Sequence, residues 1–235
     1  MPHSLELIKV KKEFPLPVLT RILNCFSGTD QRKIVFNDIN IKFKQGEIIG
    51  IIGTNGSGKT TLLKIIAGII LPTSGEIRLD DSTTQTSYSR RSKKTGLMGP
   101  NENSFYLRLT GRQNLLFFGR MYGSYKNNLS NIITNIIENF QLKEFIDRPV
   151  NLYSSGMRQK LNLARSVLNQ PEILLLDEPF KSLDRENKNF VFLFAKQYIK
   201  ENQNRTVIIA SHLQDFVEKL CSSSFTFKDG CLYKV

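Results

Sequence analysis

The segment from Gly53 to Thr60, which reads GTNGSGKT, constrains the fold of this chain more than any other part of the sequence. The run Glu47–Ile52 before it is apolar and rich in β-branched residues, as in a strand buried on both faces of a parallel sheet. The segment Lys59–Ile70 after it has helical spacing and good helix formers. Because the glycines cannot continue the strand, the sequence predicts a strand, a glycine loop and a helix in an α/β core.

The loop matches the pattern GxxxxGK followed by Ser or Thr, and each residue type in it has a chemical reason. Its backbone N–H groups can converge on phosphate oxygens, and the following helix adds the positive end of its dipole. Lys59 would bring a charge to the β- and γ-phosphates, the Thr60 hydroxyl would ligate Mg²⁺, and Thr61 would reach the α-phosphate. A turn that only connects a strand to a helix has no need of a lysine there. The residues expected to hold the phosphates are Gly53, Thr54, Asn55, Gly56, Ser57, Gly58, Lys59, Thr60 and Thr61.

A second motif, Asp177-Glu178, follows the apolar run Ile173–Leu176. Such a run predicts a buried strand, and open α/β sheets bind their ligands at the carboxyl ends of their strands. We expect Asp177 to hold Mg²⁺ directly or through water, and Glu178 to polarise a water molecule for attack on the γ-phosphate. A surface acidic pair is the alternative, but the two motifs together predict a P-loop nucleoside triphosphatase.

Between these two motifs the sequence changes from strand-like to helical. Helical spacing is found in Asn114–Met121, Ser130–Phe140 and Ser155–Leu168, whereas Leu5–Val10, Ile39–Phe43 and Val207–Ala210 are typical of strands. Residues 1–235 are therefore interpreted as a single domain with a helical insert. Its core lobe would comprise about residues 1–95 and 167–235, and its helical subdomain about residues 96–166.

Composition narrows the possible compartments and partners. The 33 Lys and Arg residues exceed the 21 Asp and Glu residues, which gives a net charge of +12. Three isolated cysteines argue against a disulfide framework or a zinc site, and no apolar stretch is long enough to span a bilayer. The first residues lack the layout of a signal peptide, so a soluble, cytosolic protein is expected. The densest basic run, Arg90–Lys94, is interpreted as a solvated loop. The alternatives, in order, are a surface near lipid head groups and a contact with nucleic acid.

The segment Leu152–Leu161, which reads LYSSGMRQKL, narrows the class of nucleoside triphosphatase. Here the chain resembles the ATP-binding subunits of the ABC transporter family, because Tyr153–Met157 is similar to that family's LSGGQ signature. Ser154 and Gly156 keep a hydroxyl and a close backbone N–H at a helix start, whereas the other three positions depart from the commonest form. A capped helix with no further role is the alternative. The resemblance implies that Ser154, Ser155 and Gly156 face the γ-phosphate held by a second copy.

Further segments resemble the same family in the expected order. Ser182–Asp184 is similar to the D-loop, through which two subunits communicate, and the resemblance implies a nucleotide-site role for Asp184. His212, at the end of an apolar run, resembles the switch histidine that contacts the γ-phosphate, and it would join the acidic base in catalysis. Phe14 and Phe26 are both candidates for the aromatic side chain that stacks on adenine, with core packing as the alternative.

One departure from the family concerns the junction between the core and the helical subdomain. The family usually has a glutamine there, but counting back from Leu109 gives Asn101 and counting forward from Gly96 gives Pro100. The coupling of nucleotide state to rotation of the helical lobe is the step that this departure affects.

The resemblance also implies a fold, cofactors and partners. The expected fold is a mostly parallel P-loop core with flanking helices, an antiparallel β subdomain and an inserted helical subdomain. Two ATP-binding subunits, as a homodimer or pseudo-dimer, would bind and hydrolyse ATP with Mg²⁺ at the cytoplasmic face of the cell membrane. They would drive export through a separate transmembrane permease, and no nucleic acid is expected. The region Asn103–Gly119 is the candidate docking surface, with core packing of its aromatics as the alternative. The alternative is a soluble ABC ATPase that acts on nucleic acid or on a cofactor-assembly complex.

Overall fold

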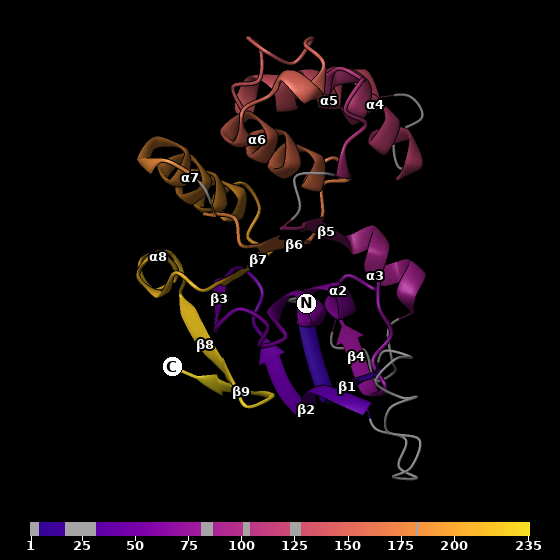
Figure 1. Cartoon of the computed structure of the whole chain (residues 1–235), viewed down its shortest axis with the longest axis vertical. Helices are drawn as coiled ribbons and strands as arrows, with labels where there is room; N and C mark the ends of the chain where they lie inside the picture. The colour runs from indigo at the N-terminus through magenta and orange to yellow at the C-terminus, as the bar shows by residue number, and fades with distance from the viewer. Residues whose placement is uncertain (1–4, 17–31, 81–86, 101–103, 123–127, 182) are drawn as a thin grey trace.

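The computed structural model describes residues 5–16, 32–80, 87–100, 104–122, 128–181 and 183–235. A six-stranded sheet with the strand order β5-β6-β7-β3-β8-β9 runs through the centre of the molecule (Figure 1). Neighbouring strands are parallel, except that β9 is antiparallel to β8. The bounds of these strands are β3 (Ile48–Ile52), β5 (Thr95–Met98), β6 (Ile173–Asp177), β7 (Thr206–Ser211), β8 (Ser223–Lys228) and β9 (Cys231–Lys234). The prediction of a mostly parallel α/β core is confirmed.

The three central strands β3, β6 and β7 are buried along their whole length. Alternate side chains point to opposite faces of the sheet, and each face belongs to a different hydrophobic cluster. Ile49 and Leu175 pack in the cluster that contains helix α2 (Lys59–Ile66), whereas Ile48 and Leu176 pack in the cluster that contains helix α7 (Arg185–Glu201). Because both faces are covered, these strands are continuous apolar runs in the sequence.

Helix α2 ends at Ile66 rather than at Ile70, where the sequence pattern placed its end. Gly68 adopts a φ of 74°, and its N–H donates to the carbonyl of Ile65. A glycine in the left-handed conformation closes a helix in this way, because it turns the backbone and satisfies the last carbonyls.

The basic run Arg90–Lys94 lies in helix α3 (Tyr88–Lys94), so the interpretation of this run as a solvated loop was wrong. Ser87 caps the helix, and basic residues in the last turn are favourable at the negative end of the helix dipole. Arg90 and Lys94 both donate to the Asp80 carboxylate at 2.8 Å, while the Arg91 side chain is buried. Much of this charge is therefore paired or enclosed.

A second sheet, with the strand order β2-β1-β4, is antiparallel and lies beside the core. Its strands are β1 (Leu5–Pro15), β2 (Arg32–Phe43) and β4 (Ser74–Leu79), and the first two are longer than the sequence pattern suggested. Lys9 has a φ of 48°, and the register of β1 shifts around it. Gly75 faces this bulge, where a Cβ atom would clash with the Lys9 carbonyl. The predicted antiparallel β subdomain is confirmed.

The inserted segment forms a helical subdomain at one end of the molecule, the upper end in Figure 1. Helix α5 (Leu129–Asn139) buries one face, and its isoleucines join the same hydrophobic cluster as the strands beneath. Helix α4 (Gly111–Met121) begins at Gly111 rather than at Asn114, because Thr110 and Gln113 form a capping box. The short helix η3 (Val150–Leu152) leads into helix α6 (Ser155–Ser166).

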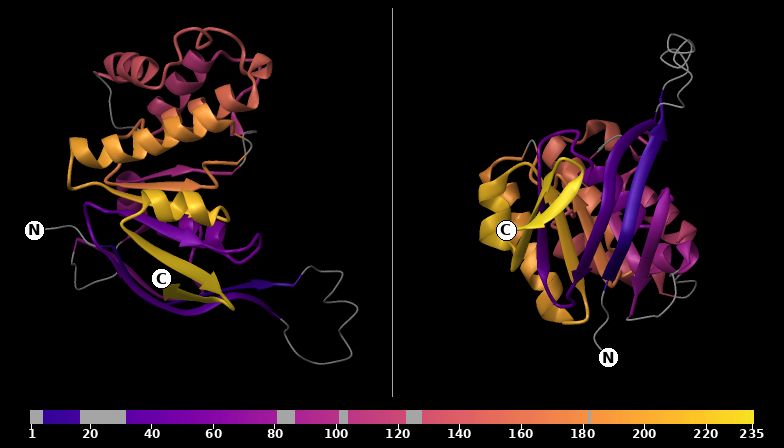
Figure 2. Two further views of the ribbon diagram at one scale, coloured as in Figure 1. Left: turned by 90° about the vertical axis from the view of Figure 1, so that its left-hand side faces the viewer. Right: turned by 90° about the horizontal axis from the view of Figure 1, so that it is seen from below.

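The remaining helices cover the central sheet. Helix α7 and the short helix α8 (Gln214–Leu220) pack on the face that also supports the helical subdomain, while α2 lies between the two sheets (Figure 2). Within the described ranges, no helix is long and apolar enough to cross a membrane.

Candidate nucleotide-binding site

The carboxyl ends of β3, β6 and β7 meet at one edge of the central sheet. In the parallel register Ile52 lies opposite Ser211, and Asp177 lies opposite Ala210. The glycine loop, the acidic pair and His212 follow these strand ends, so residues far apart in the sequence come together. This edge is where open α/β sheets bind their ligands.

The backbone of the glycine loop has the shape of an anion cradle. Gly56 and Gly58 have φ values of 81° and 113°, which favour glycine, and Gly58 caps α2. A Cβ atom on Gly58 would also lie 2.9 Å from Val35 Cγ1. Thr54, Asn55 and Gly56 are exposed, whereas the buried Ser57 Oγ has no hydrogen-bond partner among the described residues. The open backbone N–H groups, the helix start and this unpaired hydroxyl fit a phosphate group.

Lys59 lies beneath this loop with only 5% of its surface exposed. Its Nζ donates to the carbonyls of Gly53 at 2.7 Å and Thr54 at 3.0 Å, and it lies 3.6 Å from Glu178 Oε1. The ammonium group is thus held by carbonyls and a carboxylate at the mouth of the loop. A triphosphate tail placed there would be a stronger partner than the carbonyls.

Asp177 is buried at the end of β6, and its Oδ1 has no hydrogen-bond partner in the part of the chain that the structure describes. Burial raises the pKa of Asp177, while the hydrogen bond with Thr60 acts in the opposite direction; Glu178 adds to the rise. A carboxylate oxygen and a hydroxyl oxygen side by side, one with a free lone pair, match the oxygen ligands that Mg²⁺ prefers.

Glu178 is the most constrained residue of the site. Its φ of 50° is rare for a non-glycine residue, and its N–H donates to the Ala210 carbonyl at 2.8 Å. One carboxylate oxygen, Oε2, accepts from Ser211 Oγ at 3.0 Å and lies 2.9 Å from His212 Nδ1. The His212 backbone N–H donates to Oε1 at 3.2 Å. Sequence reasoning chose Glu178 and His212 separately and missed both their direct contact and Ser211, although Ser211 directly precedes His212.

The segment from Tyr153 to Met157 starts helix α6. The Ser154 Oγ accepts from the Met157 N–H at 3.2 Å, and the Ser154 N–H points to Met157 Sδ at 3.5 Å. A thioether therefore takes the place that a Glu or Gln side chain has in an ordinary capping box. Tyr153 is buried, and its hydroxyl donates to the Phe145 carbonyl at 2.7 Å; burial is the main cause that raises its pKa to about 12. Ser154 and Ser155 remain exposed.

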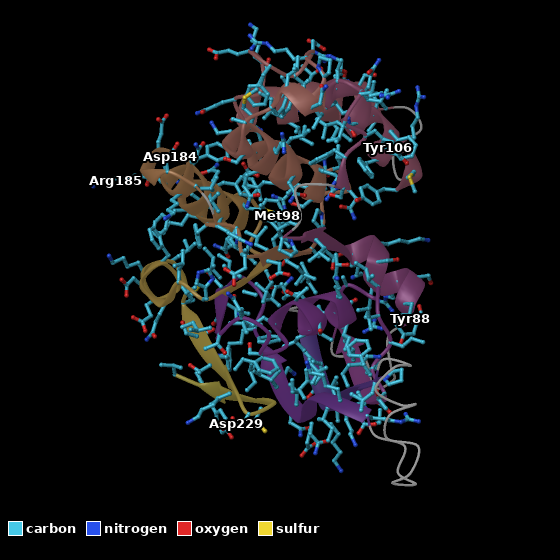
Figure 3. The ribbon with its side chains drawn as sticks, viewed as in Figure 1. Tyr88, Met98, Tyr106, Asp184, Arg185 and Asp229 are labelled. Carbon is cyan, nitrogen blue, oxygen red and sulfur yellow. The ribbon has the colours of Figure 1, made fainter. Side chains whose placement is uncertain are left out.

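Asp184 caps helix α7 and lies next to the start of α6. Its two carboxylate oxygens accept from the Asn187 backbone N–H at 2.8 Å and side-chain amide at 3.0 Å. A Cβ atom on Gly156 would lie 3.1 Å from Asn187 Nδ2, so the two helix starts are in close contact. Figure 3 shows Asp184 at the outer edge of the molecule. Leu183 is buried, while Ser182 lies outside the described residues.

The predicted site residues therefore form two groups. The first, at the sheet edge, comprises Gly53, Thr54, Asn55, Gly56, Ser57, Gly58, Lys59, Thr60, Thr61, Asp177, Glu178 and His212. The second, at the starts of α6 and α7, comprises Ser154, Ser155, Gly156 and Asp184.

Comparison with known proteins decides which family has this arrangement. The family model described as ABC transporter matches residues 36–181. The chain belongs to the ABC transporter family. It is an ATP-binding subunit of that family.

Its relatives include ATP-binding proteins of several transport systems. It is 33% identical over 203 residues to the ABC transporter ATP-binding protein NatA of Bacillus subtilis (strain 168), covering 86% of this chain and 82% of that protein. It is 34% identical to the bacitracin transport ATP-binding protein BcrA of Bacillus licheniformis, over 83% of this chain but 62% of that one. The chain thus spans less than two thirds of some curated relatives.

A solved structure shares the whole fold. The ATP-binding cassette MJ0796, in a dimeric post-hydrolysis state bound to ADP and Pi, matches with a TM-score of 0.81 and 23% identity. The match covers 97% of this chain and 96% of that one. The central sheet, the β subdomain and the helical subdomain are therefore the fold of an ATP-binding cassette.

The junction without the usual glutamine is held by α6 of this ABC protein. Asn162 Nδ2 donates to the Gly99 carbonyl at 3.0 Å, and the Arg165 guanidinium donates to Ser104 Oγ at 2.8 Å. These contacts fix both flanks of the junction, whereas Asn101 lies outside the described residues. Pro100, the other candidate, has no side-chain hydrogen-bonding group.

The aromatic candidates separate into exposed and buried side chains. Phe14 on β1 is 36% exposed with the Lys12 ammonium 4.6 Å from its ring centroid, and Phe26 lies outside the described residues. In the region chosen for docking, Tyr106 and Phe117 are exposed, with ring centroids 4.7 Å apart. Two further aromatics of that region, Phe105 and Phe118, pack against the Arg165 guanidinium instead.

Proposed function

We propose that this chain drives export through a separate transmembrane permease, by closing with a second ATP-binding subunit around two ATP molecules. The observation that carries this proposal is the division of the site into two groups on different elements. The sheet edge can bind a triphosphate within one chain, whereas the exposed helix starts contribute only if they meet the nucleotide of another copy. A homodimer or a pseudo-dimer would satisfy this requirement, and 1–235 would act as one cassette.

In this proposal the glycine loop and Lys59 bind the β- and γ-phosphates. Thr60 and Asp177 are the residues that would hold Mg²⁺, which neutralises phosphate charge and orients the oxygens when it is bound. The unpaired Asp177 Oδ1 and the contact between these two side chains support this assignment. Thr61 would contact the α-phosphate from the first turn of α2.

Glu178 would act as the general base, taking a proton from the attacking water at its carboxylate. A γ-phosphate near Lys59 would also lie near Glu178, because Nζ and Oε1 are 3.6 Å apart. His212 would hold the carboxylate in place by donating from Nδ1, and in its doubly protonated form it would also donate from Nε2 to the γ-phosphate. The Ser211 hydroxyl would donate a second hydrogen bond to the same carboxylate oxygen, Oε2.

The second subunit would contribute Ser154, Ser155, Gly156 and Asp184. The Ser154 Oγ accepts from its own helix, which leaves its hydroxyl hydrogen for a phosphate oxygen. The exposed start of α6 adds backbone N–H groups and the positive end of its dipole. These groups bind only when a γ-phosphate is present, so ATP would close the dimer and hydrolysis would open it.

The permease would dock on the exposed aromatics Tyr106 and Phe117, placing the subunit at the cytoplasmic face of the membrane. Figure 3 shows Tyr106 and Asp184 on opposite sides of the molecule, so one surface can face the permease while another faces the second subunit. Export as the direction of transport is supported by relatives named for bacitracin transport and Nod factor export. No nucleic-acid partner is proposed, because Arg90 and Lys94 are already paired with carboxylates.

The Glu178→Gln variant tests this function. It should bind ATP, hydrolyse it slowly and accumulate as an ATP-dependent dimer, measured by size-exclusion chromatography with light scattering in the presence of Mg²⁺. The control Glu144→Gln, an exposed residue in the helical subdomain, should behave as wild type. Unchanged turnover of Glu178→Gln, or a monomer at saturating ATP, would overturn the proposal.

A further inference from the structure

The turn that carries Glu178 is held from two sides. On one side Phe180, which is completely buried, stacks on Phe216 of α8 with ring centroids 5.3 Å apart. On the other side Gln159 of α6 donates from its Nε2 to the Pro179 carbonyl at 3.2 Å. The second contact joins the helical subdomain to the residue directly after the carboxylate, and the site described above does not use it.

Gln159 is polar in an apolar setting. Its side chain is 6% exposed, and Leu163, Leu183 and Val191 line the same small void. An amide buried there is unfavourable unless its donor finds an acceptor, and the Pro179 carbonyl is that acceptor. This hydrogen bond therefore holds α6 and the turn in a fixed position relative to each other.

Because of the conformation of the turn, this hydrogen bond affects the position of the Glu178 carboxylate. Glu178 has a φ of 50°. Its carboxylate lies 3.0 Å from Ser211 Oγ, 2.9 Å from His212 Nδ1 and 3.6 Å from Lys59 Nζ. A strained backbone keeps its conformation only when its surroundings hold it. A small shift of the Pro179 carbonyl would rotate the adjoining peptide and move the carboxylate relative to His212.

The same helix α6 begins at Ser154, and its first turn also contacts α7 through Gly156 and Asn187. Pro179 and Asn187 are therefore both in contact with α6. A displacement at the start of α6 would be passed to the Pro179 carbonyl, because Gln159 lies in the second turn of that helix.

We propose that Gln159 is a positioning residue that couples the start of α6 to the Glu178 carboxylate of the same chain. This inference rests on the proposed function, in which Ser154 and Gly156 bind the nucleotide of the second copy. Docking of α6 on that nucleotide then sets the base at the chain's own ATP. Hydrolysis at each site thus depends on occupancy of the other.

The test is Gln159→Met, which keeps the side-chain length and removes the donor. We expect kcat to fall about tenfold, as for one lost hydrogen bond worth ~1.4 kcal/mol. KM and the ATP affinity of the monomer should stay within about twofold, and the Hill coefficient for ATP should fall toward one. Gln197→Met, an exposed glutamine on α7, is the matched control and should keep wild-type kinetics.

A wild-type kcat and Hill coefficient in Gln159→Met would overturn the inference, as would a changed KM with kcat unchanged. Gln159→Asn keeps the amide but withdraws it from the Pro179 carbonyl, so it should show the same kcat loss even if the methionine variant folds poorly. In a Glu178→Gln background, Gln159→Met should cause no further loss, and an additional tenfold loss would place its effect elsewhere. If Glu178→Gln traps dimers while both Gln159 variants behave as wild type, only the positioning role fails.

Discussion

The carboxyl edge of the central sheet and the starts of α6 and α7 are both polar, but they satisfy their polar groups differently. At the sheet edge, Lys59 and His212 both lie within pairing distance of the Glu178 carboxylate. At the helix starts, Ser154 and Asp184 bond only within their own first turns and remain exposed. The first region pairs its charged side chains with one another and leaves only buried atoms such as Asp177 Oδ1 without a partner among the described residues, whereas the second presents exposed polar groups outward. Under the proposed function, substitutions in the first region should change phosphate affinity, and substitutions in the second should change subunit pairing.

The largest expected effect is on the first region. Lys59→Ala removes the cation at the mouth of the glycine loop, so ATP affinity should fall about 30- to 100-fold, as for loss of charge-assisted hydrogen bonds. Equilibrium binding of ATP to the monomer measures this. Lys143→Ala, at an exposed position, is the control. If the variant bound ATP within about threefold of the wild-type affinity, the sheet edge would not be the phosphate-binding region.

A smaller effect is expected in the second region. Ser154→Ala should slow hydrolysis by the dimer about tenfold and leave the ATP affinity of the monomer nearly intact, because in the proposed dimer the hydroxyl would contact the ATP of the other copy. Thr110→Ala is a matched control, since Thr110 also caps a helix through a capping box. Both variants should lose about 1 kcal/mol of stability, but only the first should lose turnover. A collapse of monomer affinity in Ser154→Ala would show that the two regions are not separable.

The smallest effect concerns the stability of the protein without nucleotide. Chiefly through burial, the pKa of Asp177 is raised above its ordinary value of 3.8, so the native state holds a proton more readily than the unfolded chain. The free energy of unfolding therefore falls as the pH rises from the ordinary pKa of the carboxyl group to its raised pKa in the native state. Above that raised pKa, the ionised and buried carboxylate remains unfavourable. Asp177→Asn should melt at a higher temperature than wild type at neutral pH, with a smaller difference in acid.

Thermal melts of Asp177→Asn with and without Mg²⁺ and ATP sharpen this prediction. The increase in melting temperature on adding both should be smaller than in wild type, because the variant lacks a carboxylate for the metal. A variant that melts below wild type at every pH would show that the burial of Asp177 carries no penalty in the native state.

Much of the first region follows from local sequence. The GTNGSGKT loop needs only its own glycines and the strand and helix beside it, and the apolar run before Asp177 identifies its strand end. The mixed fold class was also predictable, because the buried strands are short continuous apolar runs, whereas the helices show a spacing of three to four residues.

Contacts between distant segments could not be predicted in the same way. The Glu178–His212 pair depends on the parallel register of β6 and β7, and the Gln159–Pro179 bond depends on how α6 rests on the sheet. Arg91 belongs to a strongly basic run, yet it is buried because α3 turns it toward the end of α2, where it donates to the Ile65 carbonyl. These outcomes are decided by packing, which composition and periodicity do not encode.

The parallel pairing of β3, β6 and β7 has a consequence for how this protein matures. These strands come from residues 48–52, 173–177 and 206–211, so the ligand pocket cannot exist until residue 211 has been synthesised and long loops have closed. A nascent chain that ends within the helical insert would hold the lysine loop without its acidic neighbours. Nucleotide would then act during biogenesis as a late stabiliser, which selects chains that have completed the sheet.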